Sequence, residues 1–323
     1  MIVELKKKDF FIKFLINECS AYLNSYKFEN FYDFSNYENH YSNSFLKEYE
    51  THPKIQLDSF NELNINENRL YVNSKWKKQD LKNKNVLEVG SGAGKFTEIL
   101  IKTECNLFTI DSSDAIKINY KNNYNKLIND KTYFIKTDAD KFIFQHKVFD
   151  YILIYGVLQN VKNQKKIIKN SIQLLKPGGK LSFDVTKGRK FYLHLINPKY
   201  LWRIFSIKIN PAVLYNIVKF IVTKFYPVDT FFKAKLGKIG RIIAKILCPF
   251  PLINYHYLKL DLKSKIEMSV LDTYDALASR YDKPLTLNQI KKKLSEIEVE
   301  NNISINNLEI LEKNNLFVVN FSI

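Results

Sequence analysis

The chain has 323 residues, 46% of them hydrophobic, and a formal net charge of +17. A chain of this length can bury a full core, which favours a globular protein of one large or two modest domains. No run of about eighteen uncharged apolar residues occurs, which argues against a membrane-spanning helix.

The amino-terminal segment MIVELKKKDFFIKFLINECSAYL places lysines before an apolar stretch. Lys13 interrupts that stretch and no small-x-small cleavage site follows, so we expect no signal peptide and a cytoplasmic protein. The three cysteines, Cys19, Cys105 and Cys248, are far apart and lack C-x-x-C spacing. They predict neither a disulfide framework nor a metal site.

The positive charge is unevenly distributed. Lysine outnumbers arginine 45 to 5, which is typical of an AT-rich genome, but such a bias would spread lysine along the whole chain. Between Lys187 and Leu260, fourteen Lys or Arg residues stand against one acid, Asp229. This local excess needs its own explanation.

Residues 1–84 form an N-terminal extension that we expect to be partly helical. From Asn85 strand-like and helix-like segments alternate. Strands are expected at 85–90, 106–111, 132–138, 149–156 and 180–185, and helices at 95–103, 114–128 and 163–175. The segment KPGG is expected to end the last of these helices before the strand at 180–185.

A capping box, Thr286 to Gln289, opens a further core helix with Ile290, Leu294 and Ile297 on one face. The segments 304–311 and 316–323 then form a closing hairpin. The pattern predicts a Rossmann-like, doubly wound α/β fold whose mostly parallel seven-stranded sheet ends in an antiparallel strand. The core comprises 85–186 and 285–323, and a basic, amphipathic helical insertion, 187–284, follows strand five.

A glycine-rich turn, VLEVGSGAGKFTEIL, joins the first strand to the first helix. A phosphate-binding loop would need a glycine five residues before Gly94 and Ser or Thr after Lys95, and neither is present. The dinucleotide fingerprint fits Gly90 and Gly92, but its third glycine position is Lys95. In the third pattern Glu88 ends the first strand, the glycine turn follows, and Asp111 ends the second strand. This arrangement suits S-adenosylmethionine, although an acid at the position of Asp111 also suits NAD.

The segments VLEVGSGAGKFTEIL, IDSS, IKTDADKF, FDYILIYGVLQNV and LLKPGGKLSFDV, in this order and spacing, resemble class I S-adenosylmethionine-dependent methyltransferases. The resemblance covers about a hundred residues. HPKIQLDSFNELNINENRL and VLDTYDALASRYDKPLT are similar to a bacterial subgroup often linked to surface-glycan or secondary-metabolite pathways.

The resemblance implies a role for each matching residue. Glu88, Gly90 and Gly92, with Ser91 in the same turn, would line the methionine end of the cofactor. Asp111 would face the ribose, Asp138 and Ala139 the adenine, and Gly156 would lie beside the cofactor. Ser112, next to Asp111, is also expected to bind the cofactor. The histidine that the family commonly has after strand four is replaced here by the segment Gly156-Val157-Leu158-Gln159-Asn160. Taken singly, each residue also has a structural interpretation, such as a tight turn or a helix cap.

The acceptor is less determined. A general base is needed for a weak acceptor such as a sugar hydroxyl, and the candidates are His194, His256, Tyr281 and Asp282, each of which also has a purely structural interpretation. The [DN]-P-P-[FYW] segment typical of methylation at base amino groups is missing after strand four, so a nucleic-acid substrate is disfavoured. We therefore expect O-methylation of a sugar, glycan intermediate or small molecule.

The insertion contains two amphipathic stretches. In PAVLYNIVKFIVTKF the apolar residues are expected on one wide face of a helix. KIGRIIAKILCPFPL has the same amphipathic pattern. One interpretation is a helical cap with a solvated basic rim. The other is contact with an anionic inner membrane face, or with an anionic or lipid-linked acceptor. Two rival functions remain: a non-catalytic scaffold or binding protein that retains the fold, and an RNA-binding methyltransferase.

Overall fold

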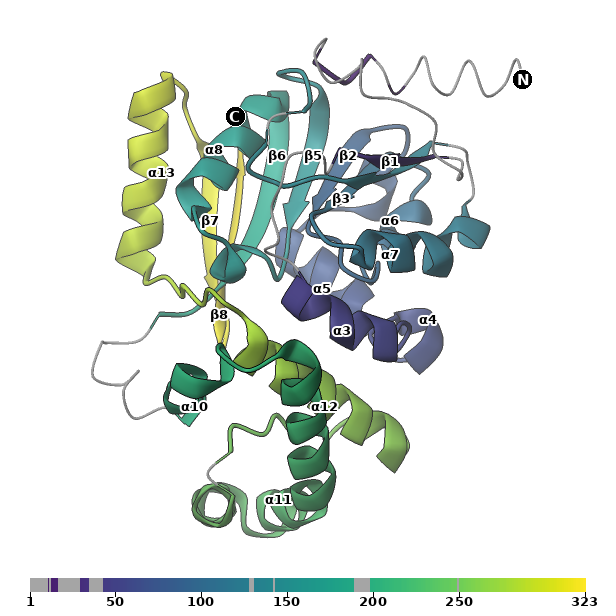
Figure 1. Ribbon diagram of the computed structural model, residues 1–323. Helices are drawn as coiled ribbons and strands as arrows, with labels where there is room; N and C mark the ends of the chain where they lie inside the picture. The colour runs from purple at the N-terminus through teal and green to yellow at the C-terminus, as the bar shows by residue number, and fades with distance from the viewer. Residues whose placement is uncertain are drawn as a thin grey trace. The chain divides into compact units, whose positions relative to one another are not determined.

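The chain divides into two compact units (Figure 1). The computed structural model describes residues 11, 13–16, 30–34, 43–127, 131–141, 143–188, 198–248 and 250–323. The first unit is formed by residues 1–42, 64–188 and 281–323, and the second by 43–63 and 189–280. The N-terminal extension therefore contributes to both units, and residues 187–188 and 281–284 lie with the first.

The first unit is built on an eight-stranded sheet with the order β1-β4-β3-β2-β5-β6-β8-β7. Its strands are β1 (Phe31–Asp33), β2 (Asn85–Val89), β3 (Asn106–Asp111), β4 (Thr132–Lys136), β5 (Phe149–Ile154), β6 (Leu175–Thr186), β7 (Asn306–Glu312) and β8 (Leu316–Ser322). The pairs from β1 to β6 are parallel, and β8 pairs antiparallel with both β6 and β7. The predicted mostly parallel sheet with an antiparallel last strand is confirmed.

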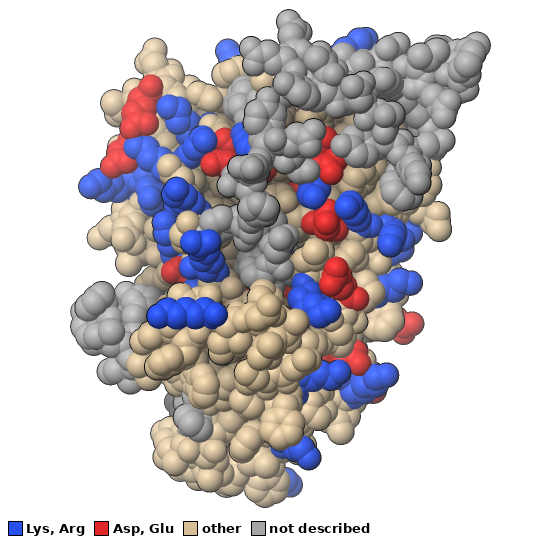
Figure 2. Space-filling model, viewed as in Figure 1, with Lys and Arg blue, Asp and Glu red and all other residues tan. Residues whose placement is uncertain are grey.

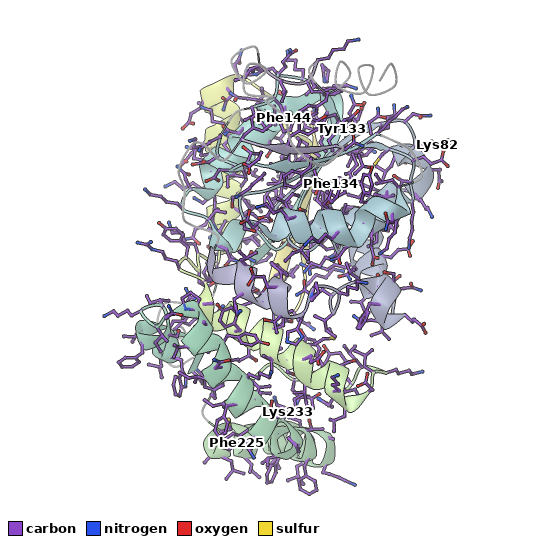
Figure 3. All side chains as sticks on the ribbon, turned by 45° about the vertical axis from the view of Figure 1, so that its right-hand side comes forward. Lys82, Tyr133, Phe134, Phe144, Phe225 and Lys233 are labelled. Carbon is purple, nitrogen blue, oxygen red and sulfur yellow. The ribbon has the colours of Figure 1, made fainter. Side chains whose placement is uncertain are left out.

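Helices cover both faces of this sheet, as the period of two in the buried strands requires. Among the described residues, the helical elements of the first unit include α5 (Ile65–Ser74), η1 (Lys78–Leu81), α6 (Thr97–Ile101), α7 (Ala115–Asn123), η2 (Tyr124–Lys126), η3 (Leu158–Asn160), α8 (Gln164–Leu174) and α13 (Leu287–Asn301). α8 and α13 pack on the face that carries Leu87, whereas α5 and α6 pack on the face that carries Val86. Tyr133 of β4 belongs to the same core cluster as Phe144, which lies in the loop after β4 (Figure 3). The next residue of the strand, Phe134, belongs to a different cluster.

The C-terminal helix of the core, α13, has the features predicted from the sequence. Thr286 and Gln289 form the predicted capping box at the start of α13. Ile290, Leu294 and Ile297 are each at most 2% exposed. An amphipathic stripe with period 3.6 is thus buried against the sheet, as its spacing predicts.

Two features of the sheet differ from the prediction. β1 is an additional strand from the N-terminal extension, paired with β4 at the sheet edge. The KPGG segment does not precede the last parallel strand but lies inside it, because β6 begins at Leu175. Gly178 adopts φ +77 there, and its N–H donates to the carbonyl of Ile323. The antiparallel partner β8 thus extends the strand into the turn.

The second unit is helical. It contains α3 (Asn43–Thr51), α4 (Asp58–Asn61), α10 (Pro198–Ser206), α11 (Pro211–Leu247) and α12 (Leu262–Ala278). Its core joins α11 and α12 through Leu214, Val218, Val270 and Tyr274 among others. α11 includes Pro227 and is kinked at Gly237, whose backbone angles are not helical.

Within the described residues, we found no helix that combines the length and the apolar character needed to cross a bilayer.

Candidate cofactor site

The glycine turn after β2 is a tightly constrained backbone segment. Gly90, Gly92 and Gly94 all have positive φ, which glycine adopts at little cost. The N–H groups of Gly90 and Ser91 both donate to the carbonyl of Ile110, at 2.8 and 3.1 Å. The turn is therefore held against the carboxyl end of β3.

Close packing also explains these glycines. A Cβ built on Gly90 would lie 2.3 Å from a methyl carbon of Val157, in the segment that follows β5. A Cβ on Gly94 would lie 2.1 Å from the amide oxygen of Asn119 on α7. The turn is consequently enclosed by its own neighbours on two sides, so part of the demand for glycine is structural.

Asp111 ends β3 directly beside the turn. One carboxylate oxygen accepts a hydrogen bond from the N–H of Gly92 at 2.9 Å. The other accepts from the N–H and hydroxyl of Ser113, at 2.8 and 2.6 Å. Burial raises the pKa of Asp111, and the hydrogen bonds from Ser113 and Gly92 oppose that shift. Asp111 is still partly exposed, and a carboxylate has about four acceptor positions, so further donors such as hydroxyls can bind.

Glu88 lies beneath the turn and is 2% exposed. Its Oε2 accepts hydrogen bonds from the hydroxyls of Thr97 and Thr109, at 2.6 and 3.0 Å. Asn119 in turn donates to the Thr97 hydroxyl at 2.8 Å. Oε1 of Glu88 is buried and has no hydrogen-bond partner among the described residues. Burial raises the pKa of Glu88 from its ordinary 4.5 to about 7, against the effect of the two threonine hydrogen bonds.

The remaining predicted cofactor residues lie at the same edge of the sheet, because parallel strands end together there. Ser112 follows Asp111 and is partly exposed. Asp138 and Ala139 lie in the loop after β4, which is tied to β3 by the Thr137 N–H donating to the Asp111 carbonyl at 2.9 Å. Gly156 has φ +78, and a Cβ there would meet no atom within 4 Å.

An ion pair at this edge was not expected from the sequence. Asp184 of β6 is buried; one of its oxygens accepts from the Gly156 N–H at 2.6 Å and the other pairs with Arg69 of α5 at 2.5 Å. The Arg69 guanidinium carbon lies 5.6 and 5.9 Å from the ring centroids of Phe96 and Tyr155. Arg69 thereby joins the N-terminal extension to the strand ends that frame the site.

The four candidate bases have different positions. Tyr281 and Asp282 lie in the first unit, where the next residue, Lys283, donates its backbone N–H to the carbonyl of Gln159 at 2.8 Å. Both carboxylate oxygens of Asp282 are buried. His256 belongs to the second unit, and its ring Nδ1 lies 3.1 Å from the side-chain oxygen of Asn254. His194 lies outside the described residues.

The donor set fits S-adenosylmethionine. A buried carboxylate oxygen without a protein partner suits an ammonium group, and the exposed part of Asp111 suits ribose hydroxyls. The open space at Gly156 lets a ligand approach the backbone. No group of three or more His, Cys, Asp or Glu side chains able to hold a metal occurs within the described part of the chain.

Comparisons with known proteins agree with this geometry. The family described as "Methyltransferase domain" matches residues 87–183. A ubiquinone biosynthesis O-methyltransferase from Coxiella burnetii is 32% identical over 117 residues, which is 36% of this chain. The chain spans about half the length of the curated relatives it matches, since the aligned part is 50% of that enzyme.

Solved structures of similar proteins are more distant. A SAM-dependent methyltransferase from Aquifex aeolicus is 12% identical, with 80% of this chain and 88% of the other covered, at a TM-score of 0.40. Another from Methanosarcina mazei is 17% identical, with 75% and 92% covered, at the same TM-score. Likeness at this level says nothing further about the site.

Proposed function

We propose that this chain, which carries a class I S-adenosylmethionine-dependent methyltransferase domain, transfers a methyl group to a hydroxyl oxygen of a sugar, a glycan intermediate or another small molecule. The observation that carries the proposal is the group formed by the glycine turn, Glu88 and Asp111 at the carboxyl edge of the sheet.

The cofactor would be held by three sets of groups. Oε1 of Glu88 and the backbone of Gly90 and Gly92 would receive the amino-acid end, Asp111 the ribose, and Asp138 with the backbone of Ala139 the adenine. When bound, S-adenosylmethionine supplies a methyl group on a sulfonium centre. The role of the chain is then to align an acceptor with that methyl group and to exclude water.

Oxygen is the acceptor atom favoured by the comparison. The curated relative is named as an O-methyltransferase. The excess of Lys and Arg between Lys187 and Leu260 favours an acceptor that carries negative charge, such as a phosphate-bearing sugar or a lipid-linked glycan intermediate.

Asp282 is the base that the geometry favours among the four candidates. The backbone at Lys283 is tied to Gln159, three residues after Gly156, and the Gln164 side chain donates to the Lys283 carbonyl at 2.6 Å. Asp282 is thereby fixed next to the segment that follows β5. A carboxylate there can accept the proton of a hydroxyl acceptor.

The test uses S-adenosylmethionine labelled in its methyl group and a panel of nucleotide sugars and lipid-linked glycans. Label recovered in an ether bond supports the proposal, and label found only on nitrogen or nucleic acid contradicts it. Asp282→Asn should slow transfer by about 10²- to 10⁴-fold while leaving S-adenosylhomocysteine affinity unchanged. Asp150→Asn is the matched control, because Asp150 lies at the amino end of β5, away from the site. An Asp282→Asn protein with wild-type turnover would exclude this base.

A further inference from the structure

Helix α10 is oriented with its polar side chains inward. Arg203 is 8% exposed and donates to the carbonyls of Ala276 and Ser279 at the end of α12. Ser206 is 3% exposed and donates to the carbonyl of Leu277. The large apolar residues of this region face outward instead: Leu201, Trp202, Ile204, Phe205 and Ile207 are between 38% and 67% exposed. This is the reverse of the usual arrangement on a surface helix.

Helix α11 has a wide apolar surface that is buried on one side and exposed on the other. Leu214, Val218 and Val222 are buried in the core of the second unit. Val213, Ile217 and Phe220, spaced by four and three residues, are 51%, 38% and 65% exposed. Consecutive residues of an α-helix are rotated by about 100°, so these two sets lie on adjacent sides of the helix. The wide apolar face expected from the sequence is thus only partly buried in this stretch, and Val228 and Phe231 continue its exposed side beyond Pro227.

The same arrangement recurs after the kink at Gly237. Ala244 and Cys248 face inward, whereas Ile239, Ile242 and Ile246 are 67%, 61% and 73% exposed. A Cβ on Gly240 would lie 1.8 Å from the carbonyl oxygen of Phe232, so the segment after the kink packs closely on the segment before it. The apolar side chains outside that contact are left uncovered.

These residues make up most of the exposed large hydrophobic side chains in the described part of the chain. Of the 23 exposed large hydrophobic side chains among the described residues, sixteen lie between Leu201 and Leu247. We call these sixteen, which include Ile207 in the turn between the two helices, the outer face of α10 and α11. Figure 2 shows a largely uncharged surface over this unit, with basic side chains at its margins. Such concentration marks an interaction surface, because scattered single residues would be ordinary.

The charge of this stretch identifies the partner. From residue 198 to 248 the sequence has ten Lys or Arg and one acid, Asp229. Asp229 is 6% exposed and forms an ion pair with Lys233 at 2.7 Å, one turn away on α11 (Figure 3 labels Lys233 and Phe225 on this helix). Lys219 and Lys224 are exposed beside the apolar side chains. The partner must accept apolar side chains and carry negative charge.

We propose that the outer face of α10 and α11 docks on the surface of an anionic phospholipid membrane. Its apolar side chains enter the boundary between head groups and acyl chains, while the lysines remain with the anionic head groups. A second copy of the chain is a poorer occupant, because two surfaces of the same positive charge would face each other. The docking needs neither cofactor nor turnover, so it is tested separately from the proposed function.

The test is flotation of the full chain with vesicles of phosphatidylcholine alone or mixed with phosphatidylglycerol. The wild type should float with the mixed vesicles and not with the neutral ones, and recovery should fall as salt rises. Phe220→Ser with Phe231→Ser should lower partitioning by about tenfold or more. Lys219→Glu with Lys224→Glu should lower it by at least about 25-fold, since loss of each lysine near the surface costs about fivefold and the added carboxylates are repelled.

Matched controls come from exposed residues of the first unit. Val72→Ser with Val299→Ser removes two apolar side chains that are 61% and 81% exposed, and Lys291→Glu with Lys292→Glu makes the same change of charge on α13. Both should float like the wild type. Equal recovery on neutral and anionic vesicles, no recovery on either, or equal losses in the controls would overturn the proposal. So would a wild-type dimer in light scattering that the Phe220 and Phe231 substitutions convert to a monomer.

Discussion

Glu88 makes the free energy of unfolding depend on pH in a way that one substitution removes. Its pKa is raised from 4.5 to about 7 by burial in the folded chain. Between these two values the unfolded chain has released a proton that the folded chain retains, so stability is highest below pH 4.5 and falls as pH rises through 7. The full loss is about 3.4 kcal/mol, of which about 2.5 kcal/mol falls between pH 5 and pH 8.

Glu88→Gln keeps the shape of the side chain and an oxygen that can accept from Thr97 and Thr109, but it cannot ionise. The free energy of unfolding of this variant, relative to wild type, should therefore be about 2.5 kcal/mol higher at pH 8 than at pH 5. Urea unfolding followed by circular dichroism at both pH values measures the difference. Glu104→Gln, which changes a half-exposed surface pair with Lys82, should show little of it. The same pH dependence in Glu88→Gln and wild type would refute the reasoning.

Three further predictions concern packing and charge around the site. Gly94→Ala should unfold more readily than Gly178→Ala, by about 1–3 kcal/mol in urea titrations, because both have positive φ but only the first Cβ meets another atom; equal losses would rule out the clash. Asp184→Asn should cost about 2 kcal/mol of stability, since it leaves the Arg69 guanidinium without its carboxylate, and a double-mutant cycle with Arg69→Met that shows no coupling would contradict the pair. The Cys105 thiol, whose pKa burial raises to about 12, should resist iodoacetamide in the native chain at pH 8, and rapid alkylation detected by mass spectrometry would show that it is accessible.

The parts of the fold that repeat a short period were predictable. Consecutive residues of β2, such as Val86 and Leu87, pack on opposite faces of the sheet. The period of two that this requires is visible in the sequence. The turn at Gly90 and the acid at Asp111 were predictable for the same reason, since each directly follows or ends such a strand. β1 was not, because its three residues are too few to show a period.

Contacts between distant residues could not be predicted from one chain. Asp184 and Arg69 are 115 residues apart, and no local pattern links them. One signal was available: arginine is rare here, five against 45 lysines, and both Arg69 and Arg203 hold several partners through a planar guanidinium. The apolar side chains of α10 face outward because Arg203 of this helix donates to carbonyl groups at the end of α12. The position of those carbonyl groups cannot be read from the sequence of α10.

The central claim is that the edge formed by the glycine turn and Asp111 binds S-adenosylmethionine. Its most direct test is calorimetric titration of S-adenosylhomocysteine into the wild type, into Asp111→Ala, and into Asp150→Ala as the control at the opposite edge of the sheet. We expect micromolar binding that Asp111→Ala weakens by about 1–3 kcal/mol through lost charge-assisted hydrogen bonds, with Asp150→Ala close to wild type. No binding to the folded wild type, or equal binding by the two variants, would contradict the assignment.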